Sequence, residues 1–270
     1  MVAVRCCRGF RFRFLLFFFF SFSPYLSLSL SEEEALLKLK KSFTNTNALS
    51  NWVGSSPCKW AGVVCTDGIV SGLHLGKMGL SGTIDIDALK QLKGLRTLSF
   101  VDDNFSGKIP DFQLLGALKS LLLTNNDFSG EIPKDYFSKM SSLKKVYLAG
   151  NKFTGKIPES LTQLKNLMEL HLENNQFSGA IPDFKQKGIT QLDMSNNKLE
   201  GAIPDDMSKY NAKSFAGNGQ LCGAPLQPCK DKATPPSPSP SPSPSQESST
   251  PETPTTPPPV TRKRSRTPSR

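Results

Sequence analysis

The stretch LLLTNNDFSGEIP, from Leu121 to Pro133, decides the fold of this 270-residue chain. Its pattern, LxLxxNxFxGxIP, recurs from Val146, from Leu170 and from Leu192, and in altered form from Leu98 and Leu73. The six copies start 25, 23, 25, 24 and 22 residues apart. Similarity at a nearly fixed period of this length is typical of solenoids, in which each copy buries its apolar edge against its neighbours.

Each position of the pattern has a structural role. The two apolar residues at its start alternate on a short strand, so both should point into the core. The Asn can satisfy buried backbone groups as the chain leaves the strand. We expect a ladder of Asn126, Asn151, Asn175 and Asn197, with Asp103 as a partial substitute and a break at Met78. We also expect an apolar spine of Phe105, Phe128, Phe153 and Phe177. The sequence thus predicts an α/β leucine-rich-repeat solenoid of six repeats of about 24 residues.

Composition divides the chain into five parts. Residues 1–31 are predicted to be a signal peptide, because four Arg precede the apolar run FLLFFFF and serines follow. A membrane anchor is the alternative, but Ser21, Ser23 and Pro24 interrupt the run before the roughly 18 apolar residues that a span needs. Residues 32–66 should form an N-terminal cap, 67–206 the repeats and 207–230 a C-terminal cap. The Pro/Ser-rich and basic residues 231–270 should be a disordered tail.

The cap sequences predict a helix and two disulfides. Ser31 and Glu34 have the spacing of a capping box before a helix that carries Leu36, Leu39 and Phe43 on one face. Cys58, Cys65, Cys222 and Cys229 are expected to pair in a secreted chain; their spacing is not that of a zinc site. Strands stack roughly 4.8 Å apart, which puts the caps more than about 24 Å apart, whereas bonded cysteines need Cα atoms within about 7 Å. Only the pairs 58–65 and 222–229 satisfy this limit.

Charge and histidine placement exclude several functions. The formal charge is +10, but residues 32–230 hold 23 basic and 20 acidic residues, so no nucleic-acid partner is expected. The two histidines, His74 and His171, are four repeats apart, roughly 19 Å by strand spacing, and cannot share a metal ion. No catalytic set of residues is apparent. We therefore predict no metal, no cofactor and no enzyme activity.

The repeat and its caps resemble a known family. The pattern, together with Trp52, the cap CKWAGVVC from Cys58 to Cys65, and Leu221-Cys222-Gly223, is similar to ectodomains of plant leucine-rich-repeat receptor-like kinases. Segments 132–137, 143–146 and 181–184 resemble the pollen receptor-like kinases. Members of that family are plasma-membrane receptors that continue into a transmembrane helix and a kinase domain. We expect neither a transmembrane helix nor a kinase domain in this sequence. No stretch after Cys229 could span a bilayer, and no kinase motif is present.

The resemblance implies an extracellular recognition module that binds a secreted peptide or small protein, with a co-receptor as a further partner. The expected location is secreted, extracellular or in the cell wall. The alternative is a wall-associated structural protein or an enzyme inhibitor, since soluble plant proteins of this fold include both.

Outward positions of the strands form the predicted binding face. Leu122 and Tyr147 are expected to be exposed, and an aromatic anchor suits a protein partner. Acidic residues near the last strands should favour a basic partner. The predicted ligand-binding residues are Lys145, Tyr147, Glu169, His171, Glu173 and Asp193; for each alone, a merely solvated position is the alternative. Asn104-Phe105-Ser106 is a glycosylation sequon, so Asn104 is the predicted glycan site.

Overall fold

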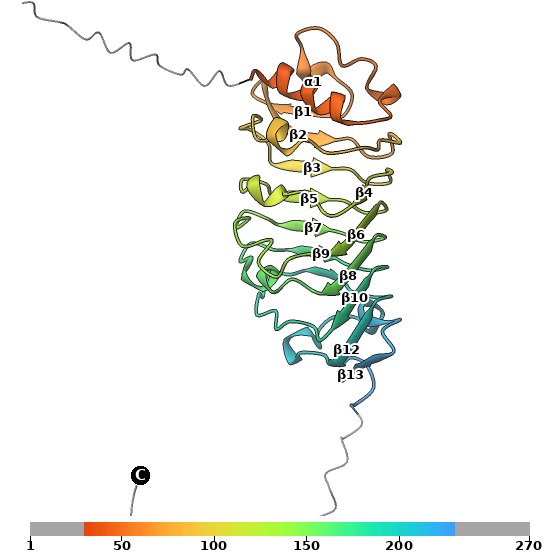
Figure 1. Ribbon diagram of the computed structural model, residues 1–270. Coiled ribbons are helices and arrows are strands. Elements are labelled where there is room, and N and C mark those ends of the chain that lie inside the picture. Colours follow the sequence, from red (N-terminus) through yellow and green to blue (C-terminus); the bar gives the residue numbers. More distant parts are fainter. Residues whose placement is uncertain (1–29, 230–270) are drawn as a thin grey trace, which may run out of the picture. The chain divides into compact units, whose positions relative to one another are not determined.

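The computed structural model describes residues 30–229 (Figure 1). Residues 1–29 of the predicted signal peptide and the predicted tail at 231–270 lie outside this range. The described residues form a stack of repeats between two caps.

The six predicted repeats are confirmed by a parallel sheet. Its strands follow one another in chain order: β2 (Ile69–His74), β3 (Thr97–Ser99), β5 (Ser120–Leu122), β7 (Lys145–Tyr147), β9 (Glu169–His171) and β11 (Gln191–Asp193). The strand β1 (Val63–Thr66) pairs with β2 in antiparallel fashion and closes one end. The register places Leu98, Leu121, Val146, Leu170 and Leu192 opposite one another, and all are buried.

The structure contains a second sheet that the sequence pattern did not predict. It contains β4 (Ser106–Gly107), β6 (Asp127–Glu131), β8 (Lys152–Lys156), β10 (Gln176–Gly179), β12 (Lys198–Ala202) and β13 (Gln220–Cys222). These short strands follow the Asn of each repeat and pair with the equivalent segment of the next. Figure 1 shows them beside the ends of the first-sheet strands. Pairing satisfies backbone groups that an isolated turn would leave unpaired.

The remaining connections contain little helix. The longest helix, α1 (Glu32–Ser42), belongs to the N-terminal cap, and α2 (Ile86–Leu89) is a single turn. Short 3-10 helices occupy Asn47–Leu49 and Pro57–Lys59 in the cap. Four more lie at Phe112–Leu114, Glu159–Gln163, Asp205–Met207 and Ala212–Phe215. These tight turns return the chain to the start of the next strand.

The predicted Asn ladder is present and is longer than expected. Asn151 is typical: its Nδ2 donates to the carbonyls of Leu123, Leu148 and Ala149, and its Oδ1 accepts from Phe128 N at 3.0 Å. Asp103 substitutes in part, since its Oδ1 accepts from the backbone of Met78 and Leu80. Asn126, Asn175 and Asn197 repeat the Asn151 arrangement. An unpredicted rung follows at Asn218.

The predicted phenylalanine spine is confirmed. Phe105, Phe128, Phe153 and Phe177 are buried, and successive rings stack with centroids 6.1 to 6.3 Å apart. Phe43, at the end of α1, extends the spine with an edge-on contact to Phe105 at 5.5 Å. The cap and the repeats therefore share one hydrophobic core.

Both caps have the expected covalent and capping geometry. The Ser31 side chain and Glu34 form the predicted capping box at the start of α1. Ser31 thus contributes to the cap structure although the predicted boundary placed it with the signal peptide. Disulfides join Cys58 to Cys65 and Cys222 to Cys229, with Cα–Cα distances of 5.6 and 4.7 Å.

Candidate functional site

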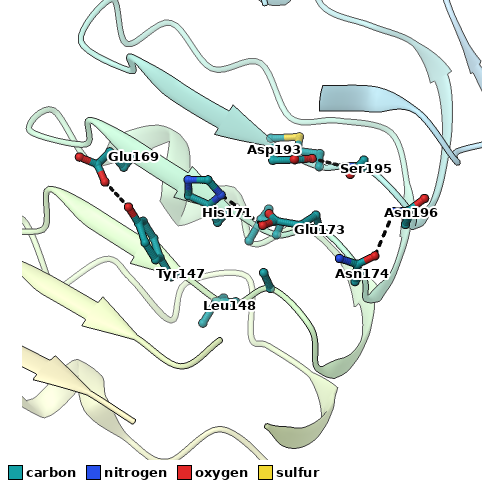
Figure 2. Close-up of polar contacts among 12 residues, drawn as sticks. Tyr147, Leu148, Glu169, His171, Glu173, Asn174, Asp193, Ser195 and Asn196 are labelled. Carbon is teal, nitrogen blue, oxygen red and sulfur yellow. Dashed lines mark hydrogen bonds and ion pairs between the residues drawn. The ribbon is translucent and has the colours of Figure 1, made fainter. Parts of the chain in front are cut away.

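The predicted binding residues lie on three neighbouring strands of the first sheet. The parallel register aligns Tyr147 of β7 with His171 of β9 and Asp193 of β11. Two residues earlier in both strands, the same register aligns Lys145 with Glu169. Glu173 follows β9 by two residues. The structure therefore brings the six predicted residues together. Figure 2 shows five of them: Tyr147, Glu169, His171, Glu173 and Asp193.

Glu169 is the centre of one cluster on this face. Lys145 Nζ lies 2.8 Å from its Oε1, and the Tyr147 hydroxyl donates to its Oε2. These two donors, the Lys145 ammonium first, hold the pKa of Glu169 below its ordinary value. Burial and the bond to Glu169 raise the pKa of Tyr147 to about 12, so its hydroxyl stays protonated. Tyr147 is thereby held in one orientation.

His171 is the centre of the adjoining cluster. Its ring contacts the Tyr147 ring edge-on, with centroids 4.5 Å apart, and its Nδ1 lies 3.2 Å from Glu173 Oε1. The bond to Glu173 raises the pKa of His171 and outweighs the opposing effect of burial. Asp193 accepts a 2.8 Å hydrogen bond from the backbone of Ser195. Figure 2 shows the Tyr147–Glu169, His171–Glu173 and Asp193–Ser195 contacts as separate pairs. We call the six predicted residues together the polar strip.

These contacts change the predicted electrostatics of the site. Glu169, Glu173 and Asp193 were expected to present an acidic patch, but each carboxylate already accepts a hydrogen bond within the protein. Lys145 offsets the charge of Glu169. Leu122 and Tyr147 were expected to be exposed, and both are half-buried. The face is a preorganised polar strip around one aromatic ring rather than an open anionic surface.

A row of left-handed backbone positions borders the strip and was missed by sequence reasoning. Asp102, Asn125, Asn174 and Asn196 have φ between 53° and 59°, each directly before a ladder residue. Asn and Asp tolerate this conformation better than other residues with side chains. Asn196 Nδ2 donates to Asn174 Oδ1 at 2.9 Å, as Asn125 does to Asp102 at 2.6 Å. The sequence signal for this backbone conformation was the Asn or Asp that immediately precedes each of these ladder residues.

Other predicted features lie apart from the strip. His74 is exposed at the start of the same sheet, four repeats from His171. Asn104 is exposed two residues before β4, and its glycosylation stays a prediction. Within residues 30–229 no group of three or more His, Cys, Asp or Glu could hold a metal ion. No helix in the same range is long and apolar enough to cross a membrane.

Comparisons with known proteins agree with this architecture. The profile described as leucine rich repeat N-terminal domain matches residues 29–66, and leucine rich repeat profiles match 116–177 and 188–210. A solved structure titled Crystal Structure of a Pollen Receptor Kinase 3 is 46% identical, with a TM-score of 0.69. The match covers 73% of this chain and 99% of that one. The chain belongs to the leucine-rich-repeat ectodomain family of plant receptor-like kinases.

Relatives of this ectodomain family are longer proteins. Pollen receptor-like kinase 4 from Arabidopsis thaliana is 44% identical over 200 residues, which cover 72% of this chain. The matched ectodomain spans only 30% of that relative's length. The HAESA receptor kinase, solved with the peptide hormone IDA and the co-receptor SERK1, is 26% identical with a TM-score of 0.61. That match covers 73% of this chain and 35% of the matched chain in that structure.

Proposed function

We propose that this ectodomain acts outside the cell as a recognition module for a secreted peptide or small protein. The binding surface is the polar strip on β7, β9 and β11. The observation that carries the proposal is Tyr147, a half-buried aromatic ring fixed between the Glu169 and His171 clusters. Large aromatic side chains held at the centre of a face are the residues that most often dominate binding energy.

The fixed orientation of Tyr147 supports binding rather than a solvated surface. A ring that is already ordered loses little conformational entropy when a partner covers it. Lys145 pairs with Glu169, and His171 in its protonated form pairs with Glu173, so the strip offers charges of both signs. A peptide with its own mixed charges would be steered in register along the strands. The HAESA complex with a peptide hormone and a co-receptor supports the same class of ligand, with a co-receptor as second partner.

The relatives' names extend the proposal to signalling in pollen. That role belongs to whole receptors, of which the matched ectodomain is 30%. We infer recognition for these residues and assign them no kinase chemistry.

Binding kinetics test the proposed surface. A candidate secreted peptide is passed over the immobilised protein at two salt concentrations. Tyr147→Ala should speed dissociation and weaken binding by about 2 kcal/mol or more, because the anchor is lost. Glu169→Lys with Glu173→Lys should change the association rate and its salt dependence. His74→Ala changes an exposed residue on the same sheet four repeats away and should bind like the parent.

Folding must be checked in each variant, because Tyr147 and Glu169 contact one another. Equal thermal midpoints for Tyr147→Ala and His74→Ala would separate loss of binding from loss of structure. Parent-like kinetics for both strip variants, with a peptide that the parent binds, would rule out the strip as the binding surface.

A further inference from the structure

Positive charge is concentrated on the edge of the solenoid where the first-sheet strands begin. The segments entering these strands and the C-terminal cap are 90–97, 113–120, 138–145, 162–169, 185–191 and 208–214. Together they hold twelve Lys or Arg and one acidic residue, Glu169. Three of the twelve form ion pairs, which join Lys90 to Asp87, Lys145 to Glu169 and Lys185 to Asp183. The segments that leave the strands toward the second sheet are 76–83, 101–108, 124–131, 149–156, 173–180 and 195–202. They hold five basic and six acidic residues. We call the first set the basic edge.

Three residues of the basic edge form consecutive rungs. Lys119 N donates to Arg96 O at 2.7 Å, and Lys144 N donates to Lys119 O at 2.7 Å. Arg96, Lys119 and Lys144 immediately precede β3, β5 and β7, respectively. Neighbouring rungs of this parallel ladder are about 4.8 Å apart. Lys119 and Lys144 are exposed, and Arg96 is half-buried. Among the described residues none of the three forms an ion pair within 4.0 Å; Arg96 Nη1 donates to the carbonyls of Lys93 and Leu95.

Such an arrangement costs stability unless a partner neutralises it. Like charges on adjacent strands repel one another. The rungs are closer than the Debye length of about 8 to 10 Å, so their fields add along the edge. The fold itself does not require an excess of positive charge, because acidic and basic residues are balanced in the segments that leave the strands toward the second sheet. The charge therefore points to an anionic ligand that extends across several repeats.

Two surface hollows lie on the same edge. One, of about 260 Å³, is lined by residues that include Lys90, Lys93 and Leu114. The other, of about 340 Å³, is lined by residues that include Lys185, Lys187 and Tyr210. Leu114 is 50% exposed, and Met168, which occupies the rung after Lys144, is 42% exposed. Apolar surface beside regularly spaced cations suits a ligand that has carboxylates and also C–H faces.

We propose that the basic edge binds a linear polyuronate, an extracellular polysaccharide with one carboxylate on every sugar ring. Its charge repeat is of the same order as one strand spacing, whereas an extended peptide places side chains of one face two residues apart, about 6.6 Å. The chain's own terminal segment is not a suitable occupant, because residues 230–270 hold seven basic and three acidic residues. The basic edge shares Lys145 and Glu169 with the polar strip, but the three rung residues Arg96, Lys119 and Lys144 lie outside the strip, so the polymer and the peptide contact different residues.

Binding to polygalacturonate tests the proposal. The variant Arg96→Gln/Lys119→Gln/Lys144→Gln is compared with Lys108→Gln/Lys156→Gln/Lys198→Gln, which removes equal charge from segments beside the second sheet. All proteins, including the parent, carry glutamine at five terminal positions, so that the basic terminus adds no background: Arg262, Lys263, Arg264, Arg266 and Arg270. The edge variant should bind about tenfold more weakly or worse and lose part of the salt dependence that polyanion binding shows. The matched control should stay within about twofold of the parent.

Further arms decide the ligand class. Lys119→Gln/Lys144→Gln keeps Arg96 and its backbone contacts, and it should show a smaller loss in the same direction. Fully methyl-esterified polygalacturonate should not bind. Equal losses in the edge variant and the matched control would overturn the site. Equally tight binding of poly-glutamate or of anionic lipid vesicles would overturn the polyuronate in favour of an acidic protein or a membrane surface.

Discussion

The side-chain amide of Asn151 donates a 2.9 Å hydrogen bond to the backbone carbonyl of Leu123, one repeat earlier in the chain. The same side chain accepts from Phe128 N, so it links two repeats and is itself buried. Asn151→Leu should lower the free energy of unfolding by about 1 to 3 kcal/mol, because the buried backbone groups lose their partner. Met78→Leu, at the position where the ladder fails, should cost less than about 1.5 kcal/mol. Urea midpoints that coincide for the two variants would contradict this assignment.

The phenylalanine spine should dominate the packing energy of the repeats. Phe153 is fully buried between the rings of Phe128 and Phe177. Phe153→Ala should destabilise the protein by about 3 to 5 kcal/mol, since it removes a large side chain and leaves a cavity. Leu114→Ala changes an apolar residue that is 50% exposed and should stay within about 0.5 kcal/mol. Calorimetric unfolding of both variants checks the contrast; similar losses would mean that the spine is not a principal packing element.

Each disulfide should stabilise its own cap. Cys58→Ser or Cys222→Ser should lower the free energy of unfolding by about 2 to 5 kcal/mol, as for native disulfides of small secreted domains. Peptide mapping of the oxidised protein should find Cys58 linked to Cys65 and Cys222 linked to Cys229. A bond between the two caps in the mapped peptides is the result that the stacked repeats do not permit.

The polar strip should make stability depend on pH in a defined window. The raised pKa of His171 contributes stability that is complete below its ordinary value of 6.5 and is lost as pH rises through the folded value. The lowered pKa of Glu169 contributes stability that is complete above 4.5 and is lost as pH falls through the folded value. Both contributions are therefore complete between 4.5 and 6.5.

Denaturation at about pH 5.5 and about pH 8 tests the histidine part of this prediction. The parent should lose stability at the higher pH, whereas His171→Gln and Glu173→Gln should lose less, because each removes the pair that raises the pKa of His171. An imidazole titration by NMR should give a midpoint above the ordinary value in the parent and a lower one in Glu173→Gln. An identical pH dependence in all three proteins would show that the His171–Glu173 contact is not maintained in solution.

Some features depended only on which residue type recurs at which position. The six repeats, the ladder from Asn126 to Asn197, the phenylalanine spine and the disulfide pairs all appear as predicted. Each follows from a local rule that a repeat applies many times, so one misjudged position does not change the answer. Asn218 had a readable signal, because Ala216-Gly217-Asn218 repeats Ala149-Gly150-Asn151. It was missed because no strand pattern of the usual type precedes it.

Other features required the tertiary structure. The second sheet depends on pairing between segments 20 or more residues apart, and its short strands have no alternating pattern that marks them. The charge of the strip depends on which partner Glu169 meets across the strands, and this is Lys145 rather than solvent. The sequence by itself determined the repeated core, because burial follows residue type and period. Only the tertiary structure decided the surface electrostatics, because the strand register determines which charged side chains lie close enough to form an ion pair.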